Sequence, residues 1–258
     1  MTSSPFRPDP TSYDSHEESP VTNPETTPVV TDPTTLLAEA VRQVKSVVVG
    51  QDRLVERVMV SLLANGHVLI EGYPGLAKTL TVATMSRVMG GSMTRIQFTP
   101  DLVPADLVGT RIWRPSTEDF DIEWGPIFAN LVLADEINRA PAKVQSALLE
   151  AMAERQVSIG GHTRALPQPF VVLATQNPIE SEGVYALPEA QRDRFLMHVT
   201  VPQPSYEEET TIAARMSTSH APQGRQVLTT DQLLELQRIT DDVFMHDAVK
   251  DYAVRLVM

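Results

Sequence analysis

The sequence predicts an α/β fold in which a mostly parallel β-sheet is flanked by helices on both faces. Short apolar runs alternate with helical patterns along most of the chain, which is typical of βα units with parallel strands. A glycine-containing loop also lies between one apolar run and a helical pattern. At 258 residues, the chain is long enough for one good core and a small second unit.

Residues 1–34 differ in composition from the rest of the chain. They hold seven prolines, twelve Ser or Thr residues, and six acids against one base. Such a segment buries too little apolar surface to offset the entropy lost on ordering, so we expect a disordered acidic tail.

The elements that follow are predicted from periodicity. Apolar residues at helical spacing predict a first helix from about Thr35 and a second one that ends near Asn65 and Gly66. Strands are expected at 67–71, 93–98, 131–135, 169–175 and 196–201, with helices between them, notably at 78–89 and 141–154. After about Pro204 the pattern is helical again, at 206–216, 228–239 and 249–257.

Two inserts interrupt this order. Residues 101–125 contain both tryptophans, and their short alternating runs predict a β-hairpin. Residues 156–169 indicate a strand, a Gly160-Gly161 turn and a second strand. Both hairpins could be plain surface features with packed aromatic residues.

The segment 72–79 has the pattern of a P-loop between a buried strand and a helix. Lys78 could reach the β- and γ-phosphates of a nucleotide, and the Thr79 hydroxyl could ligate Mg²⁺. The alternative is an ordinary strand-to-helix turn with a surface lysine. Ala77 stands where glycine is usual, and alanine is tolerable there if its φ angle stays negative. The candidate cofactor-binding residues are Gly72, Tyr73, Pro74, Gly75, Leu76, Ala77, Lys78 and Thr79.

Two further strands end in polar residues that suit the same chemistry. Asp135 and Glu136 follow an apolar run, at the end of the strand where ligands bind in open α/β sheets. We expect Asp135 to hold Mg²⁺ through water and Glu136 to activate the attacking water. Asn177 ends the next strand and could sense the γ-phosphate or position water. The alternatives are an acid pair at a helix start and a turn asparagine before proline.

Several motifs in order resemble the MoxR branch of the AAA+ ATPases. They are the loop Gly-x-Pro-Gly-x-Ala-Lys-Thr, Leu-Ala-Asp-Glu-Ile-Asn-Arg-Ala (133–140), Gln-Ser-Ala-Leu-Leu-Glu-Ala-Met (145–152), Ala-Thr-Gln-Asn-Pro (174–178), and Leu-Pro-Glu-Ala-Gln (187–191) before Asp193-Arg194-Phe195. The resemblance runs from about Thr34 to the C-terminus. Alanine before the P-loop lysine is usual in this family, so Ala77 supports the match.

The resemblance implies an AAA+ P-loop NTPase core that binds ATP with Mg²⁺ and hydrolyses it in a homo-oligomeric ring, expected to be a hexamer. It places Gly50 and Gln51 beside the adenine, although by themselves these residues indicate only the start of a helix. It makes Arg194 the finger that acts on a neighbouring subunit's nucleotide, with Arg192 as the competitor and a local ion pair as the alternative for both. The hairpin inserts would face the ring pore.

The same resemblance implies chaperone-like remodelling or maturation of client proteins, together with partners that carry a von Willebrand factor A domain. Residues 35–204 would form the ATPase core and residues 205–258 the start of a helical lid. Family members continue into further lid helices with a sensor 2 motif, so we expect this lid to be truncated. A nucleotide-dependent scaffold with little turnover is therefore the main alternative.

Composition narrows the remaining classes. The net charge of −12 argues against broad binding to nucleic acid or acidic membranes, so a nucleic-acid motor is a weaker alternative. A metal-chelatase subunit is a further, less favoured alternative. No run of apolar residues in the sequence approaches the length of about 18 that a membrane-spanning helix needs. The absence of cysteine excludes disulfides and thiolate chemistry. We expect a cytoplasmic protein.

Overall fold

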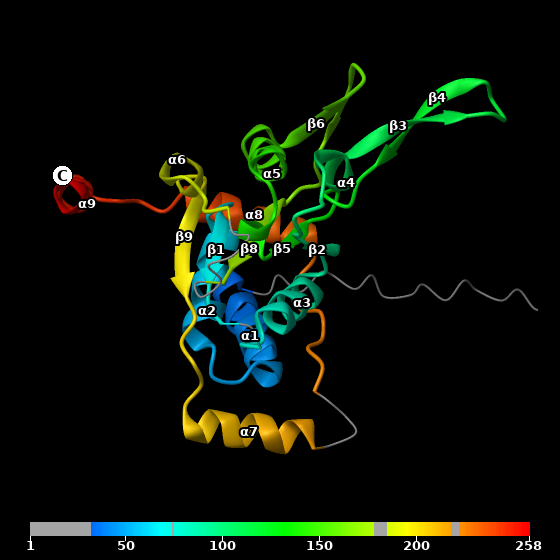
Figure 1. The fold of residues 1–258 in the computed structure, drawn as a ribbon. Coiled ribbons are helices and arrows are strands. Elements are labelled where there is room, and N and C mark those ends of the chain that lie inside the picture. Colours follow the sequence, from blue (N-terminus) through cyan, green and yellow to red (C-terminus); the bar gives the residue numbers. More distant parts are fainter. Residues whose placement is uncertain (1–31, 74, 178–184, 218–221) are drawn as a thin grey trace, which may run out of the picture. The chain divides into compact units, whose positions relative to one another are not determined.

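A computed structural model describes residues 32–73, 75–177, 185–217 and 222–258 (Figure 1). Residues 32–258 form one compact unit. Most of the expected tail, together with Pro74 and Pro178, lies outside the described residues. The first helix begins at Pro33, just before the expected end of the tail, and the Asp32 side chain caps it by accepting from the Thr35 amide at 3.1 Å.

The central sheet has five strands in the order β2-β5-β8-β1-β9, and all its neighbouring strands are parallel. The five expected strands are confirmed to within two residues at each end. They are β1 (His67–Glu71), β2 (Met93–Gln97), β5 (Leu131–Asp135), β8 (Val171–Gln176) and β9 (Phe195–Thr200). Because the strands are parallel, their carboxyl ends meet at one edge of the sheet.

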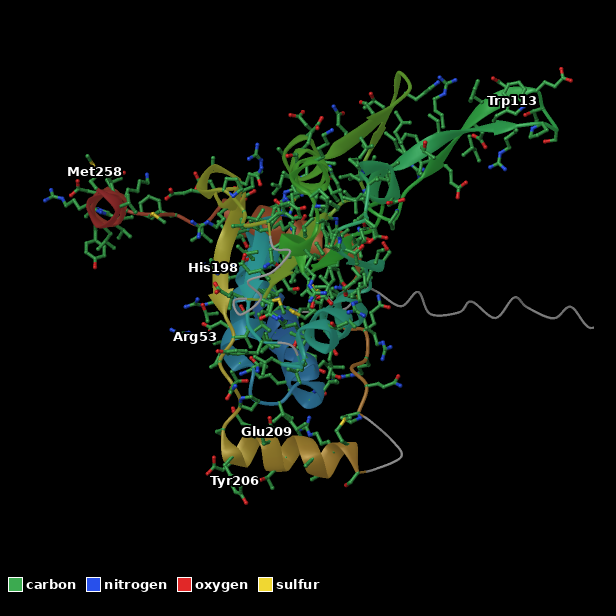
Figure 2. All side chains as sticks on the ribbon, viewed as in Figure 1. Arg53, Trp113, His198, Tyr206, Glu209 and Met258 are labelled. Atoms are coloured by element: carbon green, nitrogen blue, oxygen red, sulfur yellow. The ribbon has the colours of Figure 1, made fainter. Side chains whose placement is uncertain are left out.

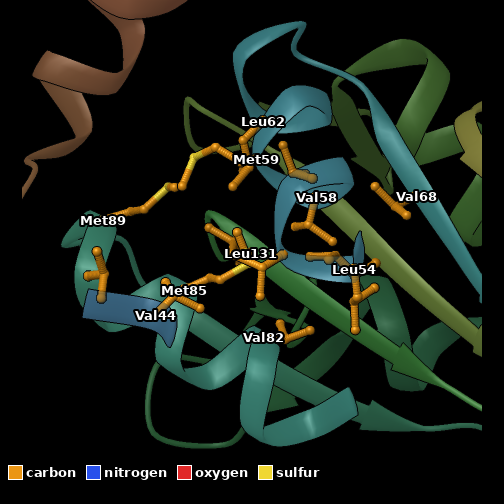
Figure 3. Packing of buried hydrophobic residues seen from close by; sticks show 14 of the residues in the cluster. Val44, Leu54, Val58, Met59, Leu62, Val68, Val82, Met85, Met89 and Leu131 are labelled. Carbon is orange, nitrogen blue, oxygen red and sulfur yellow. The ribbon is translucent and has the colours of Figure 1, made fainter. Parts of the chain in front are cut away.

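Helices cover both faces of this sheet, as predicted. Alternate residues of β5 show the division, since Leu131 and Leu133 belong to one buried cluster and Val132 and Ala134 to the other. The first cluster includes residues of α1 (Pro33–Val47), α2 (Asp52–Leu63), α3 (Lys78–Met89) and α8 (Thr230–Asp241). Figure 3 shows Met59 and Leu62 of α2 facing Met85 and Met89 of α3 across this core.

The opposite face is covered by α5 (Ala142–Glu154) and the short α4 (Pro104–Val108). The sequence did not predict α4, which has only one turn and starts at a proline inside the first insert. Both predicted hairpins are present, one from β3 (Gly109–Arg114) and β4 (Asp119–Trp124) and one from β6 (Gln156–Ile159) and β7 (His162–Ala165).

The two hairpins contact each other at their bases. The guanidinium carbon of Arg164 lies 5.3 Å from the ring centroid of Trp124 and 4.9 Å from that of Phe128. Trp113 lies nearer the tip of the first hairpin (Figure 2). It packs edge to face with Phe120, and both side chains remain about half exposed.

The C-terminal helices α7 (Tyr206–Met216), α8 and α9 (Asp247–Val257) match the predicted ones closely. Leu233 and Leu236 of α8 join the first core cluster, and the Gln237 side chain donates to the Leu62 carbonyl at 2.6 Å. All of α9 is exposed. The division between a core and a lid at residues 204 and 205 stays a prediction. The remaining short helices are η1 (Ile137–Arg139) and α6 (Glu189–Arg192).

Candidate active site

The P-loop segment leads from β1 directly into α3, whose first residue is Lys78. The Lys78 ammonium donates to the Gly72 carbonyl at 2.7 Å. Burial lowers the pKa of Lys78 below its ordinary value, and the nearby carboxylates of Asp135 and Glu136 offset only part of this shift. A half-buried ammonium at a helix N-terminus favours an anionic ligand, because the anion replaces the hydration that the lysine has lost.

The backbone of this loop differs from expectation at Ala77. Its φ angle is +54°, so the condition under which alanine would be unstrained there is not met. The loop has to reverse direction before α3, and the residue that caps the helix takes the left-handed conformation in doing so. That conformation costs an alanine on the order of 1 kcal/mol. Gly75, at φ +86°, takes a comparable conformation without a side-chain clash.

Asp135 and Glu136 are fixed at the end of β5 by a threonine of β8. The Thr175 hydroxyl donates to Asp135 Oδ1 at 2.6 Å and accepts from the Glu136 amide at 2.9 Å. Glu136 has a φ angle of +58°, which is strained for a side chain of this size. The neighbouring strand therefore holds both acids in place, and Glu136 is kept in a conformation that it would not adopt alone.

Arg95 and Gln97 of β2 complete the polar cluster, and the sequence analysis missed both. Arg95 donates to Asp135 Oδ2 from Nε at 3.1 Å and from Nη2 at 2.6 Å. Gln97 accepts from Arg95 Nη2 at 3.1 Å and donates to Glu136 Oε2 at 2.8 Å. Arg139 also pairs with Glu136, at 3.2 Å. The available signal was the alternation in β2, where Arg95 and Gln97 flank the buried Ile96.

Arg95, Asp135 and Glu136 line a cavity of about 390 Å³ at the carboxyl edge of the sheet. The predicted residues brought together there are Gly75, Leu76, Ala77, Lys78, Thr79, Asp135, Glu136 and Asn177, joined by Leu80 and Arg95. Gly72 does not line the cavity but accepts from Lys78, and Tyr73 is substantially exposed. The arrangement offers cationic and amide donors, a hydroxyl and two carboxylates around one space.

A second, more apolar cavity of about 200 Å³ adjoins the first, and the two share Gly75, Leu76, Ala77 and Leu80 as lining residues. Its other walls come from the α1–α2 turn and from α7, including Val49, Gln51, Ile212 and Met216. Gln51 lines this cavity, and its expected place beside an adenine stays a prediction. Gly50 is next to it with φ +72°, a conformation that favours glycine, and a Cβ there would lie 2.5 Å from the end of the Glu208 side chain.

Arg194 and Arg192 lie elsewhere. Because β9 begins at Phe195 and runs parallel to β1, Arg194 is at the amino edge of the sheet, opposite the P-loop. Arg194 donates to the Ala190 carbonyl at 3.2 Å and lines a separate cavity with Arg155 and Asp193. Within the described part of the chain, neither Arg192 nor Arg194 forms an ion pair. The structure therefore does not bring Arg194 to the cavity of its own chain.

A magnesium ion would find two protein ligands in the first cavity and take its remaining ligands from water or from phosphate. Thr79 and Asp135 line that cavity and supply a hydroxyl and a carboxylate. Among the residues that the structure describes, no group of three or more His, Asp or Glu could hold a metal ion by itself. Mg²⁺ is commonly held in this way, by one or two protein ligands, water and the phosphates of a nucleotide.

Comparison with known proteins shows the family to which the chain belongs. The model of the ATPase family associated with various cellular activities (AAA) matches residues 67–197, which extend from β1 into β9. The chain belongs to the MoxR family of AAA ATPases. It is 62% identical over 221 residues to the chaperone MoxR1 of Mycobacterium tuberculosis, covering 86% of this chain and 58% of the relative.

Two other relatives are covered more fully. The Bacillus subtilis protein YeaC is 44% identical over 223 residues, which cover 86% of this chain and 70% of YeaC. A crystal structure from Cytophaga hutchinsonii, described as a “putative ATPase”, matches with a TM-score of 0.81 and 44% identity over 87% of this chain and 68% of that one. The chain thus spans somewhat more than half the length of MoxR1 and about two thirds of the other two.

Proposed function

We propose that this chain binds ATP together with Mg²⁺ and hydrolyses it. The observation that carries the proposal is the single cavity in which the P-loop residues Lys78 and Thr79 lie with Asp135, Glu136 and Asn177. The adjoining apolar cavity has room for a base, and the residues shared by the two cavities suit a ligand with an anionic end and a flat apolar end. Gln51, which lines the apolar cavity, would then lie beside the base.

Each residue would have a separate task. Lys78 and the amides at the start of α3 would bind the phosphates, and Thr79 and Asp135 would hold the metal, which neutralises phosphate charge when bound. Glu136 would accept a proton from the attacking water as general base. Asn177, buried at the tip of β8, would orient that water or contact the γ-phosphate.

We further propose that the active form is a ring, expected to be a hexamer. The position of Arg194 on the edge of the sheet opposite the P-loop supports this proposal, because an arginine there is far from the P-loop of its own chain and would act on the nucleotide of a neighbouring subunit. The two hairpins would face the pore and contact the client. No helix in the described residues is long and apolar enough to span a membrane, and we propose that the protein works in the cytoplasm.

The relative MoxR1 carries the name of a chaperone. By analogy we propose that ATP hydrolysis drives remodelling or maturation of client proteins, with partners that carry a von Willebrand factor A domain. The net charge of −12 favours protein clients over nucleic acid.

The test uses two variants of the purified protein. Glu136→Gln should bind ATP as the parent does but lower the rate of phosphate release by about 100-fold or more, because an amide cannot accept the proton of the attacking water. Lys78→Ala should lose ATP binding itself. Calorimetry measures binding and a phosphate-release assay measures turnover.

Either of two results would contradict the proposal. Lys78→Ala with the parent's affinity would remove the P-loop role, and Glu136→Gln with near-parental turnover would remove the general base. Binding without turnover in the parent itself would instead favour the nucleotide-dependent scaffold.

A further inference from the structure

Arg95 binds the carboxylate of Asp135, which is proposed to hold magnesium. Two of its nitrogens donate to Asp135 Oδ2, while the Thr175 hydroxyl donates to Oδ1. Asp135 is only 8% exposed as a residue, so little solvent reaches it. Both oxygens are therefore engaged in the described structure, and a metal ion or its bound water has to compete for one of them.

The two contacts on Asp135 differ in how readily they can be given up. Thr175 is completely buried in β8, between β5 and β1. The Arg95 side chain is 51% exposed and extends from β2, the edge strand of the sheet. A half-exposed arginine on an edge strand can change rotamer without disturbing the core, so Oδ2 is the oxygen that can be vacated.

A guanidinium and a metal ion do the same electrostatic work at this carboxylate, since each compensates its buried negative charge. Without either, Asp135 would repel the phosphates of a nucleotide in the same cavity. Arg95 lines that cavity with Lys78 and Thr79, so it remains beside the phosphates after leaving Oδ2. Guanidinium groups bind phosphate oxygens as well as they bind carboxylates.

We propose that Arg95 is a positioning residue that takes the place of the metal on Asp135 and is displaced to the phosphate side when the metal–nucleotide complex binds. This inference rests on the proposed nucleotide site. It makes Arg95 and the metal partly redundant, so removing Arg95 should make nucleotide binding depend more strongly on the metal.

The experiment compares the parent with Arg95→Gln, which removes the charge but keeps a polar side chain. Calorimetry gives the Kd of ADP in EDTA and in Mn²⁺, so that no hydrolysis interferes. In EDTA, Arg95→Gln should bind ADP more weakly. In Mn²⁺ it should bind nearly as the parent does, because the metal meets no competing cation at Asp135 and this offsets the lost contact of Arg95 with phosphate. The Kd in EDTA divided by the Kd in Mn²⁺ should be about tenfold larger for Arg95→Gln than for the parent, which is within the usual range of coupling between sites.

A second measurement needs no nucleotide. Electron paramagnetic resonance of free Mn²⁺ reports metal binding to the protein alone, and Arg95→Gln should bind Mn²⁺ several times more tightly because the competing cation is gone. The matched control is Arg114→Gln, which breaks an arginine–aspartate contact of similar length, 2.9 Å to Asp121, on the first hairpin and away from the cavity. It should leave both measurements unchanged.

The inference is overturned if Arg95→Gln binds Mn²⁺ alone no more tightly than Arg114→Gln, or if its ADP ratio equals that of the control. A parent protein that fails to bind ADP would instead refute the proposed function, and the measurement with Mn²⁺ alone would still decide the role of Arg95. If Arg95→Gln does not fold, Arg95→Lys replaces it. The lysine keeps the charge without the two-nitrogen contact, so Mn²⁺ binding should tighten by a smaller factor, and no change would overturn the inference.

Discussion

Ala77 is a residue whose conformation and identity are in conflict. It lies between Leu76 and Lys78 with a φ angle of +54°, a region that glycine enters freely and alanine does not. Strain of this kind persists where the surrounding structure fixes the backbone, and it is concentrated at functional sites. The backbone of the loop is therefore strained at the residue before the lysine that is proposed to bind phosphate.

Replacing Ala77 by glycine should raise the free energy of unfolding by about 0.5 kcal/mol. Relief of the left-handed alanine contributes about 1 kcal/mol or more, and the greater freedom of glycine in the unfolded chain offsets part of it. The midpoint of urea denaturation measures the change. Ala83→Gly, at an exposed position inside α3, is the control and should lower stability by about 1 kcal/mol. A lower midpoint for Ala77→Gly would show that the strain is not there.

At the scale of residues, the sequence predicted which side chains line the cavity better than it predicted the side chains that hydrogen-bond to them. Lys78, Thr79, Asp135, Glu136 and Asn177 were predicted, and they line one cavity because parallel strands end at a common edge. Arg95 and Gln97 were missed because their contacts depend on β2 lying beside β5, and strands 34 residues apart are not paired by any local pattern. The φ angle of Ala77 depends on how the loop closes, which composition does not reveal.

At the scale of elements, His67 joins the beginning of β1 to its neighbour. Its Nδ1 accepts from the Val172 amide at 3.0 Å, and its ring packs edge to face on Phe170. Burial, aided by the positive charge of Arg155, lowers the pKa of His67 from 6.5 to about 4. The imidazole is therefore neutral in the folded protein at neutral pH.

This neutral histidine should make stability depend on pH. In the unfolded chain His67 takes up a proton below about pH 6.5, whereas in the folded protein it does so only near pH 4. Its contribution is complete above pH 6.5 and is lost as the pH falls to about 4, at a cost of about 2 kcal/mol by pH 4.5. Urea denaturation at pH 7 and pH 4.5 measures it.

His67→Asn is the matched variant, because the asparagine oxygen can accept from the Val172 amide without titrating in this range. Its loss of stability between the two pH values should be smaller than the parent's by about 2 kcal/mol. Equal losses in the two proteins would assign the acid sensitivity to other groups.

The elements themselves were largely predictable. Strands buried on both faces, such as β5 and β8, appear as short continuous apolar runs, and the capping signal before α1 is visible in Asp32 and Pro33. The helix α4 escaped prediction because five residues carry too little periodicity to be recognised. The contact of Arg164 with Trp124 and Phe128, which joins the two hairpins, depends on tertiary structure alone.

At the scale of the whole molecule, Arg194 tests assembly and chemistry together. Arg194→Ala should bind ATP as the parent does yet hydrolyse it more slowly, on the order of 10³-fold, since a finger contributes that much or more in related hydrolases. Mixing it with Glu136→Gln should restore part of the activity, because only mixed rings contain an interface with both an intact Glu136 and an intact Arg194. Phosphate release measures the recovery.

The controls separate assembly from chemistry. Native mass spectrometry shows whether the two variants co-assemble, and Arg192→Ala in place of Arg194→Ala tests the competing arginine. Co-assembled rings with no more activity than either pure variant would rule out Arg194 as the trans-acting residue. Recovery seen only with the Arg192 variant would transfer that role to Arg192.

The helix α5 lies between the carboxylates of the candidate active site and the second hairpin. It begins shortly after Glu136 and η1, ends at Glu154, and leads through Arg155 straight into β6 of the second hairpin. Its 13 residues span about 20 Å, and the chain from Ile137 to Ile159 contains no glycine that could act as a hinge. Arg155 clamps the far end by donating to the carbonyls of Asn65 and Phe170 at 2.8 and 2.6 Å. Because α5 is one continuous helix whose far end is held by Arg155, we expect a displacement at the carboxylates to rotate the helix and so to move the second hairpin.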